Sequence, residues 1–214
     1  KNPLFSLDST TIKLCLNTFD WAKFRTAKGA IKIHTKLNHS GNIPDFLVIT
    51  DGKCADITGV KTTFDFSPDS IIVFDKGYID FEWLFSLHKK GVFFVTRAKD
   101  NMAYHVTGQH AFTEGTGVIS DDEIALTGQK AAKYYPDKLR MVKYYDINTN
   151  KVYTFITNNF KLAAKTIADI YKDRWQIELF FKWIKQNLKI KSFWGTSENA
   201  VMSQIWVAMI FYLL

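Results

Sequence analysis

An unbroken run of four apolar residues, Ile71-Ile72-Val73-Phe74, limits the fold of this chain more than any other feature. Such a run is typical of a strand that is buried on both faces of a sheet. Helical spacing follows from Asp80 to Lys90, Gly91 ends it, and Val92 to Thr96 reads as a second buried strand. Because strand–helix–strand units are parallel and right-handed, the sequence predicts an α/β fold.

Three further strands are expected ahead of this unit. Leu4 to Leu16 reads as the first, and Ile31 to Asn38 and Asp45 to Thr50 are joined by a turn at Ser40-Gly41-Asn42. Asp56 to Thr63 has the spacing of a short helix. Three antiparallel strands followed by a parallel pair predict a mixed sheet flanked by helices.

The composition changes after Arg97, where polar residues and turns become frequent. Strand-like runs follow at Gly117 to Leu126, Leu139 to Ile147 and Val152 to Thr157, and Asn148-Thr149-Asn150 reads as a hairpin tip. A long helix is then expected from Leu162 to about Ile190, with the apolar residues Ile177, Phe181, Ile184 and Leu188 on one face, and a last helix from about Glu198. We therefore expect residues 1–99 to form the first part of a core, 100–160 a β-rich insertion, and 161–214 the second part with the long helix.

The charge favours an anionic partner such as nucleic acid. The chain has 28 Lys and Arg against 21 Asp and Glu, a net charge of +7 and a pI near 9.2. Basic residues cluster from Lys161 to Lys191 and again in the run Lys23, Arg25, Lys28, Lys32 and Lys36. Two such patches suit a groove that grips a duplex, although two solvated faces of a basic protein would look the same.

The cysteines and the apolar segments indicate where in the cell the protein is expected. Cys15 and Cys54 are the only cysteines, without zinc-type spacing, so a reduced, intracellular protein is expected. The apolar run from Ile205 to Leu214 is much shorter than the roughly 20 residues that cross a bilayer, so no membrane partner is expected. That run reads as a buried helix which the sequence cuts off, and the start without Met likewise suggests a fragment of a longer protein.

Four residues of the long helix form the pattern Y-x2-R-x3-E-x6-K: Tyr171, Arg174, Glu178 and Lys185. At roughly 100° per residue they project within an arc of about 60° around the helix axis. A carboxylate among two cations and a phenol suits a surface that meets a metal ion and phosphates together. The alternative is an Arg174–Glu178 helix salt bridge, which contributes roughly 0.2–0.5 kcal/mol.

Two aspartates could join Glu178. Asp8 lies inside an otherwise apolar strand, and Asp75 closes a buried strand at the carboxyl edge of the sheet, where ligands of α/β proteins gather. If the first strand is central, the two are neighbours, and a helix across the sheet could supply Glu178. Convergent carboxylates suit hard divalent cations, and two Mg²⁺ about 4 Å apart would serve phosphodiester cleavage. Taken alone, Asp8 could instead satisfy a neighbouring backbone group or threonine hydroxyl, and Asp75 could begin a turn before Lys76-Gly77.

These residues carry a resemblance to a known family. The chain resembles, over essentially its whole length, the DDE transposases of bacterial insertion sequences, in the cut-and-paste group with the Y-R-E-K signature. The landmarks are Leu7-Asp8-Ser9-Thr10, Gly29-Ala30-Ile31-Lys32-Ile33-His34, Asp75-Lys76-Gly77-Tyr78, Phe94-Val95-Thr96-Arg97-Ala98-Lys99 and the Tyr171–Lys185 pattern, which is the most specific. The resemblance implies a ribonuclease-H-like mixed sheet interrupted by a β-rich insertion before the last catalytic helix.

The resemblance also implies roles. Asp8, Asp75 and Glu178 would hold two Mg²⁺, for which Mn²⁺ can substitute, while Tyr171, Arg174 and Lys185 contact phosphates at the transposon end. Lys76 and Arg97, within the quoted landmarks, are expected to contact DNA as well. The partners would be double-stranded DNA of the transposon ends and target, with a homodimer on DNA, in the bacterial cytoplasm at the nucleoid. The reaction would be strand cleavage at the ends followed by strand transfer.

In such enzymes a tryptophan of the insertion commonly stacks on a flipped base during a hairpin step. None of the six tryptophans of this chain lies between residues 100 and 160. Tyr134 or Tyr135 could substitute, although a core or interface role suits that pair better.

Two other functions share part of this pattern. A related metal-dependent nuclease would have the carboxylates but would not need the phosphate-binding trio beside Glu178. A transposase-derived DNA-binding protein without catalysis would be favoured by loss of a carboxylate, and all three are present.

Overall fold

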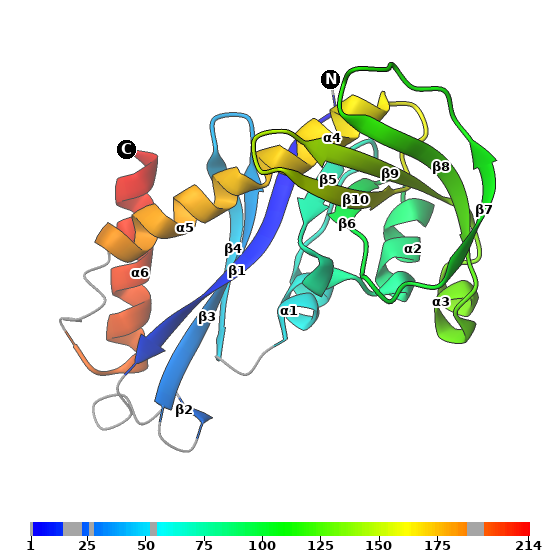
Figure 1. Ribbon diagram of the computed structural model, residues 1–214. Coiled ribbons are helices and arrows are strands. Elements are labelled where there is room, and N and C mark those ends of the chain that lie inside the picture. Colours follow the sequence, from blue (N-terminus) through cyan, green and yellow to red (C-terminus); the bar gives the residue numbers. More distant parts are fainter. Residues whose placement is uncertain (1, 15–22, 26–27, 52–54, 188–194) are drawn as a thin grey trace. The chain divides into compact units, whose positions relative to one another are not determined.

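The computed structural model describes residues 2–14, 23–25, 28–51, 55–187 and 195–214 (Figure 1). The chain forms two compact units: unit 1 comprises Lys1–Phe5 and Asp65–Arg174, and unit 2 comprises Ser6–Phe64 and Trp175–Leu214. Each unit combines β-sheet with helices, which confirms the predicted α/β class with a mixed sheet flanked by helices. The domain boundaries expected from the sequence stay a prediction.

Unit 1 is built on a mixed sheet in the order β5-β6-β10-β9-β8-β7. Only β5 and β6 are parallel, as predicted for the strand–helix–strand unit, and the other neighbours are antiparallel. The elements are β5 (Ile71–Phe74), η1 (Lys76–Tyr78), α2 (Phe81–Lys89), β6 (Phe93–Arg97), β7 (Tyr104–Gln109), β8 (Val118–Leu126), α3 (Gln129–Tyr134), β9 (Leu139–Asp146), β10 (Lys151–Thr157) and α4 (Ala164–Asp173).

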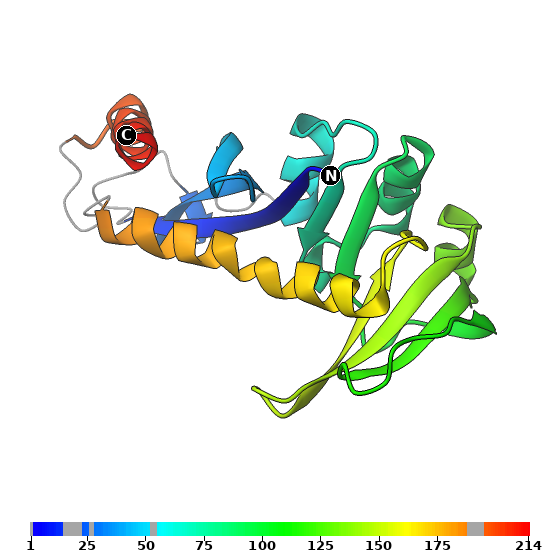
Figure 2. The ribbon, with the colours of Figure 1, turned by 90° about the horizontal axis from the view of Figure 1, so that it is seen from above.

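Helices cover both faces of β5, which explains its unbroken apolar sequence. Side chains alternate along a strand, so Ile71 and Val73 join the core cluster under α4, while Phe74 turns to the other face and meets Trp83 of α2 at 5.3 Å between ring centroids. Figure 2 shows α2 and α4 on opposite sides of β5 and β6. The predicted two-sided burial of this strand is confirmed.

Unit 2 has a smaller sheet in which β3 is central. Strand β3 pairs antiparallel with β4 and β2 and has β1 as a further neighbour. Strand β1 begins in unit 1 with Leu4 and Phe5 and continues through unit 2. The elements are β1 (Leu4–Leu14), β2 (Lys23–Arg25), β3 (Lys28–Asn38), β4 (Ile43–Asp51), α1 (Asp56–Thr63), α5 (Trp175–Asn187) and α6 (Glu198–Leu213).

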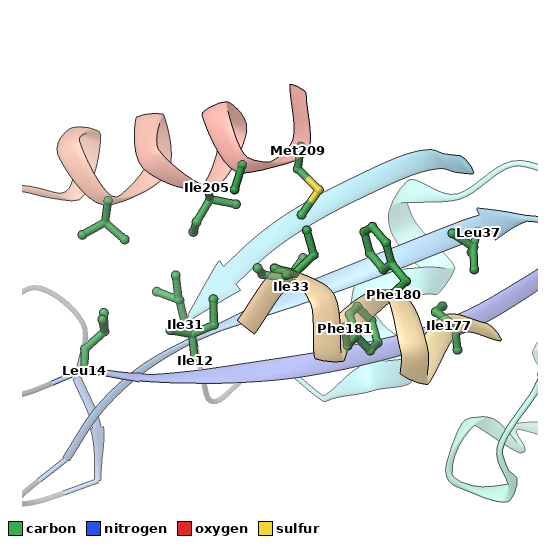
Figure 3. Close-up of a cluster of buried hydrophobic side chains, with 13 residues drawn as sticks. Ile12, Leu14, Ile31, Ile33, Leu37, Ile177, Phe180, Phe181, Ile205 and Met209 are labelled. Carbon is green, nitrogen blue, oxygen red and sulfur yellow. The ribbon is translucent and has the colours of Figure 1, made fainter. Parts of the chain in front are cut away.

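The core of unit 2 lies between this sheet and helices α5 and α6. Ile12 and Leu14 of β1, and alternate residues of β3 such as Ile33, pack against Phe181 of α5 and Ile205 of α6 (Figure 3). Three of the apolar positions that the sequence assigned to one face of the long helix, Ile177, Phe181 and Ile184, are buried here, and the fourth, Leu188, lies outside the described residues. The sequence therefore identified the packing face of α5 correctly.

The opposite face of β3 carries a buried histidine under α1. His34 is fully buried, and its Nε2 lies 2.9 Å from Thr50 Oγ1. A Cβ at Gly59 of α1 would come within 2.8 Å of the His34 ring, so only glycine lets the helix approach this closely. Burial lowers the pKa of His34 below its ordinary value of 6.5, and the neighbouring Lys32 acts in the same direction, while Asp56 opposes both.

This burial predicts a stability that depends on pH. The unfolded chain binds a proton at His34 more readily than the folded chain, so the free energy of unfolding should fall as the pH drops below 6.5 through the lowered folded pKa. Urea denaturation at a series of pH values measures the slope. His34→Phe, which fills a similar space without titrating, should lose this part of the acid sensitivity. Parallel pH curves for the two proteins would contradict the prediction.

Several boundaries differ from the expectation. The single long helix is two helices, because the N–H of Arg174 bonds to Tyr171 O at 3.2 Å and interrupts the regular ladder between α4 and α5. Its expected end near Ile190 lies outside the described residues. Three elements were missed: β2, the edge strand β7, which is almost wholly solvated, and the short helix α3, which has no side-chain N-cap. The strands of the expected insertion do form, and β10 bonds directly to β6.

Candidate functional site

Asp8 lies on the face of β1 that meets α5. Because Asp8, Thr10, Ile12 and Leu14 alternate along one face of the strand, Asp8 points to the same side as the apolar pair that packs on the helix. Its Oδ1 accepts a hydrogen bond from the N–H of Ser9 at 2.8 Å. The carboxylate is only partly buried, so it remains accessible to solvent.

Glu178 lies in the first turn of α5, next to the buried face of that helix. A cavity of about 470 Å³ opens beside it and is lined by Thr10, Glu178, Phe181, Lys182, Lys185 and Gln186. Thr10 is two residues after Asp8 on the same face of β1, so this cavity joins the helix that carries Glu178 to the strand face that carries Asp8. Lys185 is exposed at its rim.

Lys182 and Thr10 are lining residues that the sequence reasoning did not single out. Lys182 stands four residues after Glu178, a spacing that places it on the same side of the helix, and this signal could have found it. Thr10 had no comparable signal, because its role depends on which helix covers β1.

Asp75 ends β5 in unit 1, at the carboxyl edge where it was expected. Its Oδ1 accepts from the N–H of Lys76 at 2.7 Å and so caps the 3-10 turn η1. The same oxygen lies 3.5 Å from the hydroxyl of Tyr171, which is placed to donate to it. Asp75 therefore also begins a turn, which was the alternative role considered for it. This role uses Oδ1 and does not conflict with a metal-ligand role for Oδ2.

Tyr171, which reaches Asp75, also contacts Arg174. The guanidinium of Arg174 lies over the Tyr171 ring, 5.6 Å from its centroid. Burial raises the pKa of Tyr171 above its ordinary value, although Arg174 opposes that rise. The phenol therefore keeps its proton at neutral pH and can donate a hydrogen bond.

Lys76 and Arg97 differ in how their charges are held. Lys76 Nζ lies 3.1 Å from Asp100 Oδ2, but the side chain of Asp100 is 90% exposed, and such pairs are weak. Arg97 follows Thr96, the register partner of Phe74, so it stands beside Asp75 at the carboxyl ends of the parallel strands. Its guanidinium lies 5.2 Å from the ring centroid of Tyr153.

The eight expected site residues thus fall into two groups. Unit 1 contains Asp75, Lys76, Arg97, Tyr171 and Arg174, and unit 2 contains Asp8, Glu178 and Lys185. Within neither unit do three His, Cys, Asp or Glu side chains of the described residues form a group that could hold a metal ion. The convergence of the three carboxylates therefore stays a prediction, as does the single face shared by the four signature residues.

The donor set nevertheless suits magnesium. Asp8, Asp75 and Glu178 are partly buried carboxylates, each on a regular element or directly at its end, and they offer only oxygen atoms. Hard divalent cations prefer such oxygen ligands, and partial burial leaves room for the waters that Mg²⁺ retains. The residues present fit the expected ions in chemistry.

The second basic patch, the run from Lys23 to Lys36, has fewer unpaired charges than the sequence indicated. Lys32 Nζ lies 3.0 Å from Asp56 Oδ1, and Lys36 Nζ lies 2.5 Å from Asp45 Oδ2. Both lysines are largely buried and paired, with side chains 14% and 13% exposed. The side chains of the other three members lie outside the described residues. The distant acidic partners could not be read from the local sequence.

The two tyrosines of the insertion differ in exposure. Tyr135 is 1% exposed and packs against Phe85 and Phe94, so it is a core residue and cannot stack on a base. Tyr134 is 42% exposed. The core role is confirmed for Tyr135. No helix among the described residues is long and apolar enough to cross a membrane.

Comparison with known proteins gives a consistent result. A family model described as "Transposase DDE domain" matches residues 1–214. The chain is 38% identical, over 97% of its length, to a Sinorhizobium fredii protein that bears the name transposase y4zB. It is 31% identical, over 99% of its length, to a Geobacillus stearothermophilus protein named as a transposase for insertion sequence element IS5377. It spans only 58% and 55% of these two relatives.

A solved structure supports the fold. The cryo-EM structure of the piggyBac transposase synaptic complex with hairpin DNA matches with a TM-score of 0.53 at 10% identity. The match covers 98% of this chain and 47% of that one. The likeness agrees with the ribonuclease-H-like fold that was expected.

Proposed function

Because the chain belongs to the transposase DDE domain family, we propose that it is the catalytic part of a transposase that cleaves DNA at the ends of an insertion sequence and transfers the freed strands to target DNA. One observation carries this proposal. Within each unit, signature residues stand beside an expected carboxylate: Tyr171 with Asp75 in unit 1, and Lys185 with Glu178 in unit 2. Phosphate-binding groups next to carboxylates are what phosphodiester chemistry requires.

In this proposal Asp8, Asp75 and Glu178 hold two Mg²⁺, with Mn²⁺ as a substitute. When bound, such ions activate a water or a 3′-hydroxyl and stabilise the leaving oxygen. Asp75 is kept in place by the N–H of Lys76 and by the Tyr171 hydroxyl, both of which meet Oδ1, so that Oδ2 accepts from neither donor. A protonated Tyr171 suits this role.

The cations would bind the DNA. Arg174 and Arg97 on unit 1 and Lys185 on unit 2 contact phosphates near the cleaved bond, and Lys76 exchanges its weak pairing with Asp100 for a phosphate. The partners are the double-stranded ends of the element and its target, bound by a homodimer at the nucleoid in the bacterial cytoplasm.

Crystals soaked in Mn²⁺ test the catalytic assignment. We expect anomalous-scattering peaks at the carboxylates of Asp8, Asp75 and Glu178. A DNA-binding protein without catalysis would bind a duplex but show no peak there and no cleavage in Mg²⁺. Carboxylates that stay far apart in an ordered crystal with bound DNA would overturn the proposal.

Replacing Lys185 tests the DNA contact. Lys185→Ala should weaken binding to a random-sequence duplex and lower the slope of log K against log salt by about 0.9, the value expected for one lost phosphate contact. Fluorescence anisotropy over a range of NaCl concentrations measures both quantities. Lys61→Ala is the matched control, because Lys61 is an exposed lysine of α1, away from the cavity. An unchanged slope for Lys185→Ala would count against the assigned contact.

A further inference from the structure

Tyr153 of β10 contacts Arg97, a cation of the candidate site. Tyr153 belongs neither to the Y-R-E-K signature nor to the other family motifs of this chain. The Arg97 guanidinium lies over its ring at 5.2 Å from the centroid. Of the ion pairs formed by the described residues, none includes Arg97. The contact with the Tyr153 ring supports this cation without neutralising it.

Strand pairing explains why the two side chains meet. Arg97 of β6 is the register partner of Phe155 of β10, and Tyr153 is two residues from Phe155 on the same face. A residue and the diagonal neighbour of its partner lie within reach of long side chains. This contact thus depends on the pairing of β6 with β10.

A series of aromatic contacts also connects the ring of Tyr153 to Asp75, the expected catalytic carboxylate of this unit. It stacks on Phe155 with centroids 6.1 Å apart and an interplanar angle of 14°, and Phe155 lies 4.8 Å from the Tyr171 ring. Tyr171 in turn reaches Asp75. Arg97, Asp75 and the aromatic residues between them therefore form one packed cluster on the α4 side of the sheet.

We propose that Tyr153 is a positioning residue, which holds the Arg97 guanidinium in place for a DNA phosphate beside Asp75. An arginine stacked by its flat face keeps the N–H donors at its edge available for a bidentate contact with phosphate. Because the stack restricts the side chain before DNA arrives, less conformational freedom is lost on binding. This inference rests on the proposed function, since it takes DNA as the ligand.

The structure separates the two parts of Tyr153. Its hydroxyl lies 3.3 Å from Thr149 Oγ1 in the β9–β10 hairpin, while its ring face meets Arg97. Tyr153→Phe keeps the ring and should bind a fluorescein-labelled random-sequence duplex like the wild type. Tyr153→Leu removes the ring and should weaken that binding about two- to fivefold, the size expected for an exposed cation–π contact.

A double-mutant cycle distinguishes positioning from simple packing. Arg97→Ala should weaken binding and lower the salt slope by about 0.9. In the Arg97→Ala background, Tyr153→Leu should have no further effect on DNA affinity, because the cation that it positions is gone. Thermal unfolding of all four proteins is measured in parallel, since a packing defect would appear there whether or not Arg97 is present.

The binding measurements distinguish a failure of this inference from a failure of the proposed function. Coupled losses in affinity, with full binding by Tyr153→Phe, support the inference. Additive losses, or a Tyr153→Phe variant as weak as Tyr153→Leu, overturn it while leaving the proposed function intact. A wild-type protein that does not bind the duplex would overturn both.

Discussion

Glu178→Gln should reduce Mg²⁺-dependent DNA strand cleavage by more than about 100-fold, since even outer-shell changes at metal sites cost about 10- to 100-fold and this change alters a ligand itself. DNA binding should remain within about threefold of wild type, because the substitution removes a metal ligand and no phosphate contact. Cleavage of a labelled duplex carrying an end of the element, and anisotropy with the same duplex, measure the two quantities separately.

A structural role for Glu178 predicts a different result. As an acidic residue in the first turn of α5, it stabilises the helix by about 0.3–1 kcal/mol through the helix dipole, so a purely structural change would lower stability slightly and leave cleavage intact. Glu198→Gln is the matched control, because Glu198 is an exposed acid in the first turn of α6. That variant should cleave normally. Unimpaired cleavage by Glu178→Gln would remove Glu178 from the catalytic set.

The second large effect concerns stability. Arg140→Met should lower the free energy of unfolding by about 3–5 kcal/mol, because it leaves Asp121 buried without its partner. Arg140 Nε and Nη2 donate to the two carboxylate oxygens of Asp121 at 2.7 and 2.6 Å, and the two side chains are 5% and 1% exposed. Its Nη1 donates to the carbonyls of Leu162 and Asn159 at 2.6 and 3.0 Å.

Urea denaturation measures this loss, and two further variants identify its cause. Combining Arg140→Met with Asp121→Leu removes both buried charges and should restore much of the stability. Lys138→Met breaks an exposed pair with Glu123 instead and should cost less than about 1 kcal/mol. A double variant as unstable as Arg140→Met would show that the loss comes from the backbone contacts ahead of α4, and not from the unpaired Asp121.

Local sequence was sufficient wherever a short segment fixes its own structure. The four apolar residues of β5, the spacing of α2 and the αL residue Gly91 that follows it, with φ of 73°, all form as expected. The buried face of α5 was also identified, because periodicity alone decides which side of a helix is apolar. Asp75 was placed at the carboxyl edge by the same local reasoning.

The contacts that define the site were not available from local sequence. Nothing near Tyr153 indicates that β10 pairs with β6, and only that pairing brings its ring to Arg97. Lys32 was counted with a basic patch until the fold placed Asp56 beside it. Tyr135 could have been exposed or buried, and the packing of α2 and β6 decided the matter.

The sequence by itself therefore determined the order and type of most elements and the apolar face of α5, since those depend on the period of side chains along one strand or helix. Tertiary structure alone decided which charges are paired and which aromatic faces support them, because these contacts join residues far apart in the chain. The Tyr171–Asp75 contact, 96 residues apart, is one example. Pairing between distant segments has no local period that would reveal it.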